Sequence, residues 1–179
     1  ALNISLPIYS IYFGTGLLIG IGGSTLMSIE KGRGRLDKAD KIFTLSFILG
    51  LILAIIYCII GFVFLEEIAL ILGATKEIMP LVKEYMIVVV AGTIPFVMGS
   101  VMAPFIRADK APKKAMFAVI FSGFLNIILD YIFVFPLNMG MRGAAIATVF
   151  SYTISCLILL THLLSKNNTL RFMKDFYKL

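Results

Sequence analysis

The chain contains five long apolar runs, separated by short clusters of charged residues. A membrane hydrocarbon core of about 30 Å needs about 20 apolar residues in a helix, and each run is long enough to supply one. Only 15% of the residues are charged, against roughly 25% in soluble domains. We therefore expect an all-α integral membrane protein. The predicted membrane spans are residues 2–29, 42–65, 81–106, 115–135 and 144–164.

The first apolar run does not have the features of a secretory signal. It lacks a basic leading region and is longer than the usual apolar core of about 7–15 residues. The chain also begins at Ala1, already inside this hydrophobic run. We expect the sequence to be a segment of a longer protein.

Most of the 16 basic residues lie in alternate loops, which predicts the orientation of the chain in the membrane. Cytoplasmic loops carry an excess of Lys and Arg. The first loop, the third loop and the tail are therefore predicted to be cytoplasmic, with the amino end outside. The basic residues of these three segments are Lys31, Arg33, Arg35, Lys38, Lys41, Arg107, Lys110, Lys113, Lys114, Lys166, Arg171, Lys174 and Lys178.

Composition and motifs argue against other classes of function. The net charge of +6 is spread over these loops as a topology signal, so we expect no nucleic-acid partner. The sequence shows no Ser/His/Asp set, metalloprotease motif or Walker loop, and no second candidate catalytic carboxylate lies deep within a predicted span. We therefore expect no enzyme activity and no cofactor. Cys58 and Cys156 lie in apolar spans without CxxC spacing and are interpreted as packing residues.

Glycine and proline mark where helices pack closely or bend. Gly16 and Gly20 form a small-xxx-small pair that lets another helix approach, although a bend or a backbone-lined passage is the alternative. In the third span, Pro95 and Pro104 each remove a backbone donor and predict a bent helix.

The loops between the spans carry weaker signals. Asp37 is a candidate N-cap for the second span, and Pro80 marks the start of the third. Residues 65–74 form a short amphipathic stretch closed by Gly73, which is predicted to lie on the outer membrane surface. Asp109 is expected to be a solvated loop charge, and His162 an interfacial residue without a metal-binding pattern.

The only acidic residue deep within a predicted span is Asp130. Such a side chain costs about 2.5–3.5 kcal/mol at the centre of a membrane helix, and it commonly marks a path for an ion or substrate. Asn126 lies four residues earlier and shares its helix face. Helix rise places Asp130 about 7–8 Å and Thr148 about 6 Å inside the outer boundary, with Asn126 about one turn deeper.

Asp130, Asn126 and Thr148 are therefore predicted to form a cation site. Carboxylate, amide and hydroxyl oxygens are hard ligands that suit Na⁺, while the carboxylate alone can carry a proton. The alternative is a structural role, in which Asp130 is hydrogen-bonded by Asn126 or Thr148 and binds nothing.

Three stretches resemble the multidrug and toxic compound extrusion (MATE) transporters. Asn126–Phe135 with the following Met139–Thr148 is similar to the fifth and sixth helices of that family, and this is the most specific stretch. Gly20–Ser24 with its basic turn resembles the second helix. Leu72–Ala74 followed by Glu84–Met86 resembles the entry to the fourth.

The resemblance implies helices two to six of a six-helix amino-terminal lobe, in a bacterial plasma-membrane protein. MATE proteins export cationic or amphipathic compounds in exchange for Na⁺ or H⁺. Their amino-lobe cation site uses residues that match Asn126, Asp130 and Thr148, together with an aspartate on a first helix that this chain lacks. The missing first helix, the carboxyl-terminal lobe and membrane lipids are therefore the implied partners.

Two other functions are compatible with the sequence. A lipid-linked oligosaccharide flippase of the wider superfamily shares the lobe plan, but such flippases typically present basic residues inside the cavity. Here the intramembrane charge is acidic, which favours a cationic substrate. A non-transporting membrane scaffold, with Asp130 purely structural, is the third alternative.

Overall fold

The computed structural model describes residues 2–165 and 168–176, and this part of the chain is all-helical. The first helices are α1 (Leu2–Gly32), α2 (Leu36–Val63) and the short α3 (Leu65–Ile71). They are followed by α4 (Met79–Ala91), α5 (Thr93–Ala108), α6 (Pro112–Val134) and α7 (Gly140–Leu160). Four of these are long and apolar enough to cross a membrane, or five spans if α4 and α5 count as one. The predicted fold class is confirmed, and each predicted span falls on a helix or on the α4–α5 pair.

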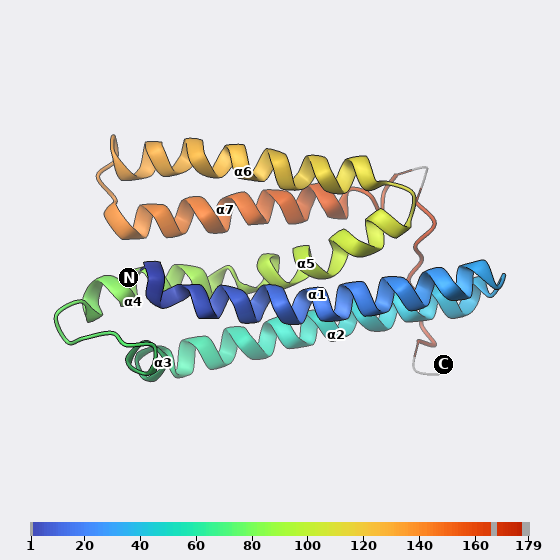
Figure 1. Ribbon diagram of the computed structural model, residues 1–179, viewed down its shortest axis with the longest axis horizontal. Helices are drawn as coiled ribbons and strands as arrows, with labels where there is room; N and C mark the ends of the chain where they lie inside the picture. Colours follow the sequence, from blue (N-terminus) through green and yellow to red (C-terminus); the bar gives the residue numbers. More distant parts are fainter. Residues whose placement is uncertain (1, 166–167, 177–179) are drawn as a thin grey trace.

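The long helices form two antiparallel pairs with a third layer between them (Figure 1). α6 and α7 form one pair, α1 and α2 form the other, and α5 runs between them in contact with all four. The α1–α2 turn, the α5–α6 turn and the segment after α7 lie at the same end of the bundle (Figure 1). These are the three segments in which the basic residues gather.

The core of the bundle lies along α5. Its buried side chains include Phe96, Val101, Met102 and Phe105, all without exposed surface. The outer helices show the opposite pattern, since only 11% of the most apolar window of α6 is buried within the chain. An apolar outer face requires no burial in protein when lipid surrounds the helix. This distribution is the one expected of a membrane bundle.

The glycines of α1 allow it to lie directly against α5. A Cβ on Gly20 would lie 2.8 Å from the carbonyl oxygens of Ser100 and Val101, and one on Gly16 would lie 2.7 Å from the Ser100 Cβ. Gly16 and Gly20 therefore serve close helix packing, as the small-xxx-small pattern predicts.

The third predicted span is broken into α4 and α5, which meet at an angle of 47°. The break falls at Gly92, three residues before Pro95. Pro95 cannot donate a hydrogen bond to the carbonyl of Ala91, so the helix is interrupted one turn before it. The expected bend is confirmed at this proline, whereas Pro104 lies inside α5 without a break.

Two predictions for the short segments have different outcomes. The amphipathic stretch forms α3, and the chain leaves it through Gly73 at φ +93°, a conformation that favours glycine. Asp37, however, is not the N-cap of α2. The cap position is Arg35, which makes no side-chain capping bond, and Asp37 lies in the first helical turn, where its charge complements the helix dipole.

Candidate functional site

Two of the three predicted site residues are in direct contact. Asn126 on α6 donates from Nδ2 to the Thr148 hydroxyl on α7 over 3.4 Å. The same hydroxyl donates to the carbonyl of Ala144, one turn earlier in α7, over 2.9 Å. The hydroxyl oxygen of Thr148 therefore accepts a hydrogen bond from α6, and its second lone pair remains available to another partner.

The predicted depth of Thr148 is wrong by about one turn. α6 ends at Val134, but α7 begins at Gly140, four residues before the expected start. At 1.5 Å per residue, Asn126 and Thr148 each lie about 12 Å from the outer ends of their helices, and Asp130 about 6 Å. Asn126 is thus level with Thr148, and Asp130 lies one turn nearer the outer end.

Asp130 carries a buried oxygen without a partner. Its Oδ1 is inaccessible to solvent and makes no hydrogen bond to the residues that the structure describes. An unpaired buried carboxylate oxygen costs several kcal/mol, on the order of the penalty for other buried charges. The described part of the chain thus leaves one oxygen of this partly buried carboxyl group without a donor.

Two tyrosines join the site from the other side of the bundle. Tyr85 on α4 is buried and interacts electrostatically with Asp130. Its hydroxyl lies 3.1 Å from the hydroxyl of Tyr9 on α1. Sequence reasoning missed both, because a tyrosine near the end of a span reads as part of the interfacial aromatic belt. The structure shows that Tyr85 interacts with Asp130 and that Tyr9 reaches Tyr85 from α1.

The oxygen atoms at this position are chemically suited to a hard cation. Asp130 supplies a carboxylate, Asn126 an amide oxygen and Thr148 a hydroxyl oxygen, all ligand types used for such ions. Within the described ranges, no group of three or more His, Cys, Asp or Glu side chains converges as a metal site. The cation site predicted from the sequence would therefore have one charged ligand and two neutral ones.

An apolar cavity of about 150 Å³ lies deeper in the bundle, between α1, α5, α6 and α7. Phe13, Phe96 and Tyr152 line it, and Phe96 and Tyr152 are in ring contact at 4.6 Å. Drug-sized ligands occupy roughly 300–1,000 Å³. This cavity alone is therefore too small to hold such a compound.

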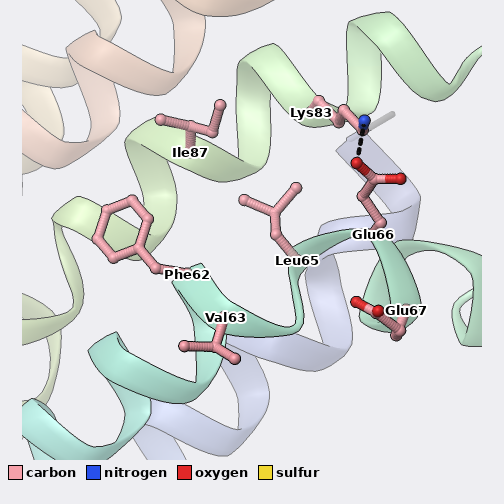
Figure 2. Close-up of a pocket in the computed structure, with 7 residues that line it drawn as sticks. All are labelled: Phe62, Val63, Leu65, Glu66, Glu67, Lys83 and Ile87. Atoms are coloured by element: carbon pink, nitrogen blue, oxygen red, sulfur yellow. Dashed lines mark hydrogen bonds and ion pairs between the residues drawn. The ribbon is translucent and has the colours of Figure 1, made fainter.

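A second hollow lies between α2, α3 and α4, at the end of the bundle opposite the basic segments (Figure 2). Figure 2 shows Glu66 reaching toward Lys83 across this hollow, while Phe62 and Leu65 lie below it. The Glu66 side chain is 64% exposed, and an exposed ion pair contributes only about 0–1 kcal/mol. The ion pair links α3 to α4 at the surface. The hollow is therefore a surface feature that is distinct from the Asp130 site.

Asp109 is not the solvated loop charge that the sequence predicts, and it pairs with His162. Asp109 is 2% exposed and His162 is 1% exposed, and the His162 Nε2 lies 2.9 Å from an oxygen of Asp109. Sequence spacing could not reveal this pair, because 53 residues separate the two and only the bundle topology brings them together.

Comparison with known proteins places this arrangement in one family. The family model described as MatE matches residues 1–132. The multidrug export protein MepA of Staphylococcus haemolyticus is 31% identical over 172 residues, which cover 96% of this chain and 38% of that protein. The chain thus spans well under half the length of this relative.

Two solved structures of MATE transporters have the same fold. An inward-facing conformation of a multidrug resistance MATE family transporter of the MOP superfamily is 26% identical and superposes with a TM-score of 0.87 over 98% of this chain and 42% of that one. An outward-facing conformation is 29% identical, with a TM-score of 0.84 over 98% of this chain and 39% of that one. Because the family model covers well over half of the residues, this membrane-spanning chain belongs to the MatE family of transporters.

Proposed function

We propose that this chain is part of the amino-terminal lobe of a secondary active multidrug exporter. The complete protein would move cationic or amphipathic compounds out of the cell in exchange for Na⁺ or H⁺. The observation that carries the proposal is the unpartnered buried oxygen of Asp130, one helical turn from Asn126, whose amide donates to Thr148. The family of the chain and the name of its staphylococcal relative support export as the activity.

In this proposal Asp130 switches between two charge states. A Na⁺ ion or a proton neutralises the carboxyl group in one conformation and leaves it in the other, so that coupling rests on the difference in cation affinity between them. Asn126 and Thr148 supply neutral oxygens to the ion. Tyr85 and Tyr9 supply hydroxyl groups that reorient when the charge of Asp130 changes.

The lobe is proposed to move largely as a unit. It superposes almost equally well on the inward-facing and outward-facing structures, at TM-scores of 0.87 and 0.84. Alternating access would then come from movement between lobes rather than from rearrangement within this one. The substrate would lie between the lobes, since the cavity within this chain is small.

We propose that the amino end of the chain lies outside the cell membrane and the carboxyl end in the cytoplasm. The grouping of the basic segments at one end of the bundle supports this orientation (Figure 1). Fusion of a cytoplasm-active reporter after residue 164 should give signal, and fusion in the α6–α7 turn should give none. The reverse pattern would contradict the orientation.

The function is tested by ethidium efflux from vesicles that contain the full-length protein. We expect efflux to require an inward gradient of Na⁺ or of protons, and the two are separated by imposing each gradient alone. Stimulation by Na⁺ at constant pH assigns sodium coupling, and stimulation by the pH gradient without Na⁺ assigns proton coupling. An absence of efflux under both gradients would contradict multidrug export and favour the flippase or the scaffold.

A further inference from the structure

A peptide segment after α7 lies across the end of the bundle where the basic segments gather. We call residues Asn168–Met173 the strap; no helix includes them. The backbone N–H of Thr169 donates to Asp109 over 2.9 Å, and the N–H of Met173 donates to the Thr44 hydroxyl over 3.0 Å. Between them, the N–H of Arg171 donates to Asp40 over 3.3 Å. Every second amide of the strap is therefore bound by a side chain of the bundle.

The residues between these amides anchor the strap by apolar contacts. Leu170 is 3% exposed. The ring of Phe172 lies 5.1 Å from the rings of both Phe43 and Phe47 on α2. Alternation of bound amides and apolar anchors is the pattern of an extended peptide seated in a groove.

Asp109 is the point at which the strap joins the rest of the bundle. Its two oxygens accept hydrogen bonds from Lys31 at the end of α1, at 2.9 Å, and from both the backbone and the hydroxyl of Thr169. His162, just after α7, lies 2.9 Å from the second oxygen. The Lys31 ammonium also donates to the Thr169 hydroxyl over 2.6 Å. One carboxylate thus connects α1, α5, the end of α7 and the strap.

The local backbone directs Asp109 into this cluster. Asp109 caps α5, with its N–H donating to Phe105 over 2.8 Å. The next residue, Lys110, takes a left-handed conformation at φ 63° and turns the chain sharply into α6. A buried charge that is fully paired in this way is strongly destabilised when a partner is removed, because the remaining charges lose their compensation.

We propose that Asp109 is a positioning residue that fastens the strap and clamps the cytoplasmic ends of α1, α2, α5 and α7 into one rigid unit. The break at Gly92 lies in the other half of the bundle, so bending within the lobe is confined there. Under the proposed function, the second lobe follows the strap, and a fixed strap transmits movement from one lobe to the other. That last step rests on the proposed function; the clamp itself does not.

Hydrogen exchange of the full-length protein tests the clamp. We expect the strap amides to exchange slowly in the wild type and about tenfold faster or more in Asp109→Asn and in Phe172→Ala. The end of α1 should also lose protection in Asp109→Asn, because Lys31 loses its ionic partner, but not in Phe172→Ala. Asp175→Asn, which changes an exposed carboxyl group just beyond the strap, should match the wild type. Unchanged strap protection in the first two variants would overturn the clamp.

A cross-link tests whether the strap stays attached during transport. Phe47→Cys and Phe172→Cys are combined in a protein without other accessible thiols and joined by a short bifunctional thiol reagent. We expect ethidium efflux to be unchanged by the cross-link, and efflux that is lowered by Asp109→Asn to be restored by it. Loss of efflux on cross-linking would show that the strap must detach, which overturns the rigid unit. Absence of efflux before cross-linking would instead count against the proposed function and leave the exchange result intact.

The attachment of the strap should also depend on pH. Burial alone would raise the pKa of Asp109, but hydrogen bonds from Thr169, Lys31 and His162 outweigh it and hold that pKa below its usual value of 3.8. A carboxyl group whose pKa is lowered by folding stabilises the folded state at pH values above its pKa in the unfolded chain. This stabilisation is lost as the pH falls through the pKa of the folded state. Strap protection, corrected for intrinsic exchange, should therefore be retained down to about pH 5 and decline progressively as the pH falls below about 4.

The same titration in Asp109→Asn identifies the group. The other charged side chains that line the pocket around Asp109 are Asp37, Asp40, Lys110 and Arg171. Of these, Asp40 also binds the strap. We expect the variant to lack the main acid transition, with any small residual step belonging to Asp40. A transition of unchanged size in the variant would overturn the role of Asp109.

Discussion

Replacing Asp130 by Asn in the full-length transporter should reduce ion-driven ethidium efflux by about a hundredfold or more, to the rate of empty vesicles. The change keeps the shape of the side chain but removes the charge that a proton or Na⁺ would neutralise. The two charge states of the proposed cycle then become one, so the ion gradient can no longer drive export. Efflux in vesicles with equal amounts of wild-type and variant protein measures the effect.

Substitutions around Asp130 should have graded effects on the same assay. Thr148→Ala and Asn126→Ala each remove one neutral oxygen, and we expect them to raise the Na⁺ concentration for half-maximal efflux if Na⁺ is the coupling ion. Asp175→Asn, an equal change of charge on an exposed carboxyl group, should leave efflux unchanged. Efflux by Asp130→Asn at the wild-type rate would disprove the proposed role of this residue and favour a structural one.

Replacing Gly20 by Ala should destabilise the bundle by about 1–3 kcal/mol, as other overpacking substitutions do. The new Cβ would lie 2.8 Å from two backbone carbonyl oxygens of α5. Backbone atoms within a helix cannot move aside as a flexible side chain can, so α1 and α5 must separate. Thermal unfolding of the purified full-length protein, followed by the loss of its monodisperse peak in size-exclusion chromatography, measures the effect.

Gly22 provides a matched control on the same helix. A Cβ at Gly22 would meet nothing within 4 Å. Gly22→Ala should therefore leave the unfolding temperature unchanged or raise it, since Ala is favoured over Gly in a helix by roughly 0.5–1 kcal/mol. Equal unfolding temperatures for the two variants would show that the close approach of α1 to α5 does not limit stability.

The break between α4 and α5 shows what a sequence pattern can predict about a helix and what it cannot. A proline in a long apolar run predicts a bend from covalent chemistry alone, because the missing N–H is a property of the residue. Pro95 interrupts the helix and Pro104 does not, although both lack the same donor. The difference lies in the surroundings, since Pro104 is buried among the helices that pack around α5. The sequence does not reveal which helices pack around a proline.

The candidate site shows the same division. The spacing of Asn126 and Asp130 places both on one helix face, and the apolar surroundings single out Asp130. The register of α7 against α6 depended on how the turn between them closes, and it differs from the expectation by about one turn. Tyr9 and Tyr85 meet only because α1 and α4 pack against each other.

By itself, the sequence determined the membrane class, the number and approximate ends of the spans, and the glycines at which α1 meets α5. These follow from local rules, namely the length of apolar runs and the size of single side chains. Tertiary structure alone decided that Tyr9 meets Tyr85 and that Asp109 meets His162. Such pairs join helices far apart in the chain, and their contact depends on how whole helices pack, which no local pattern records.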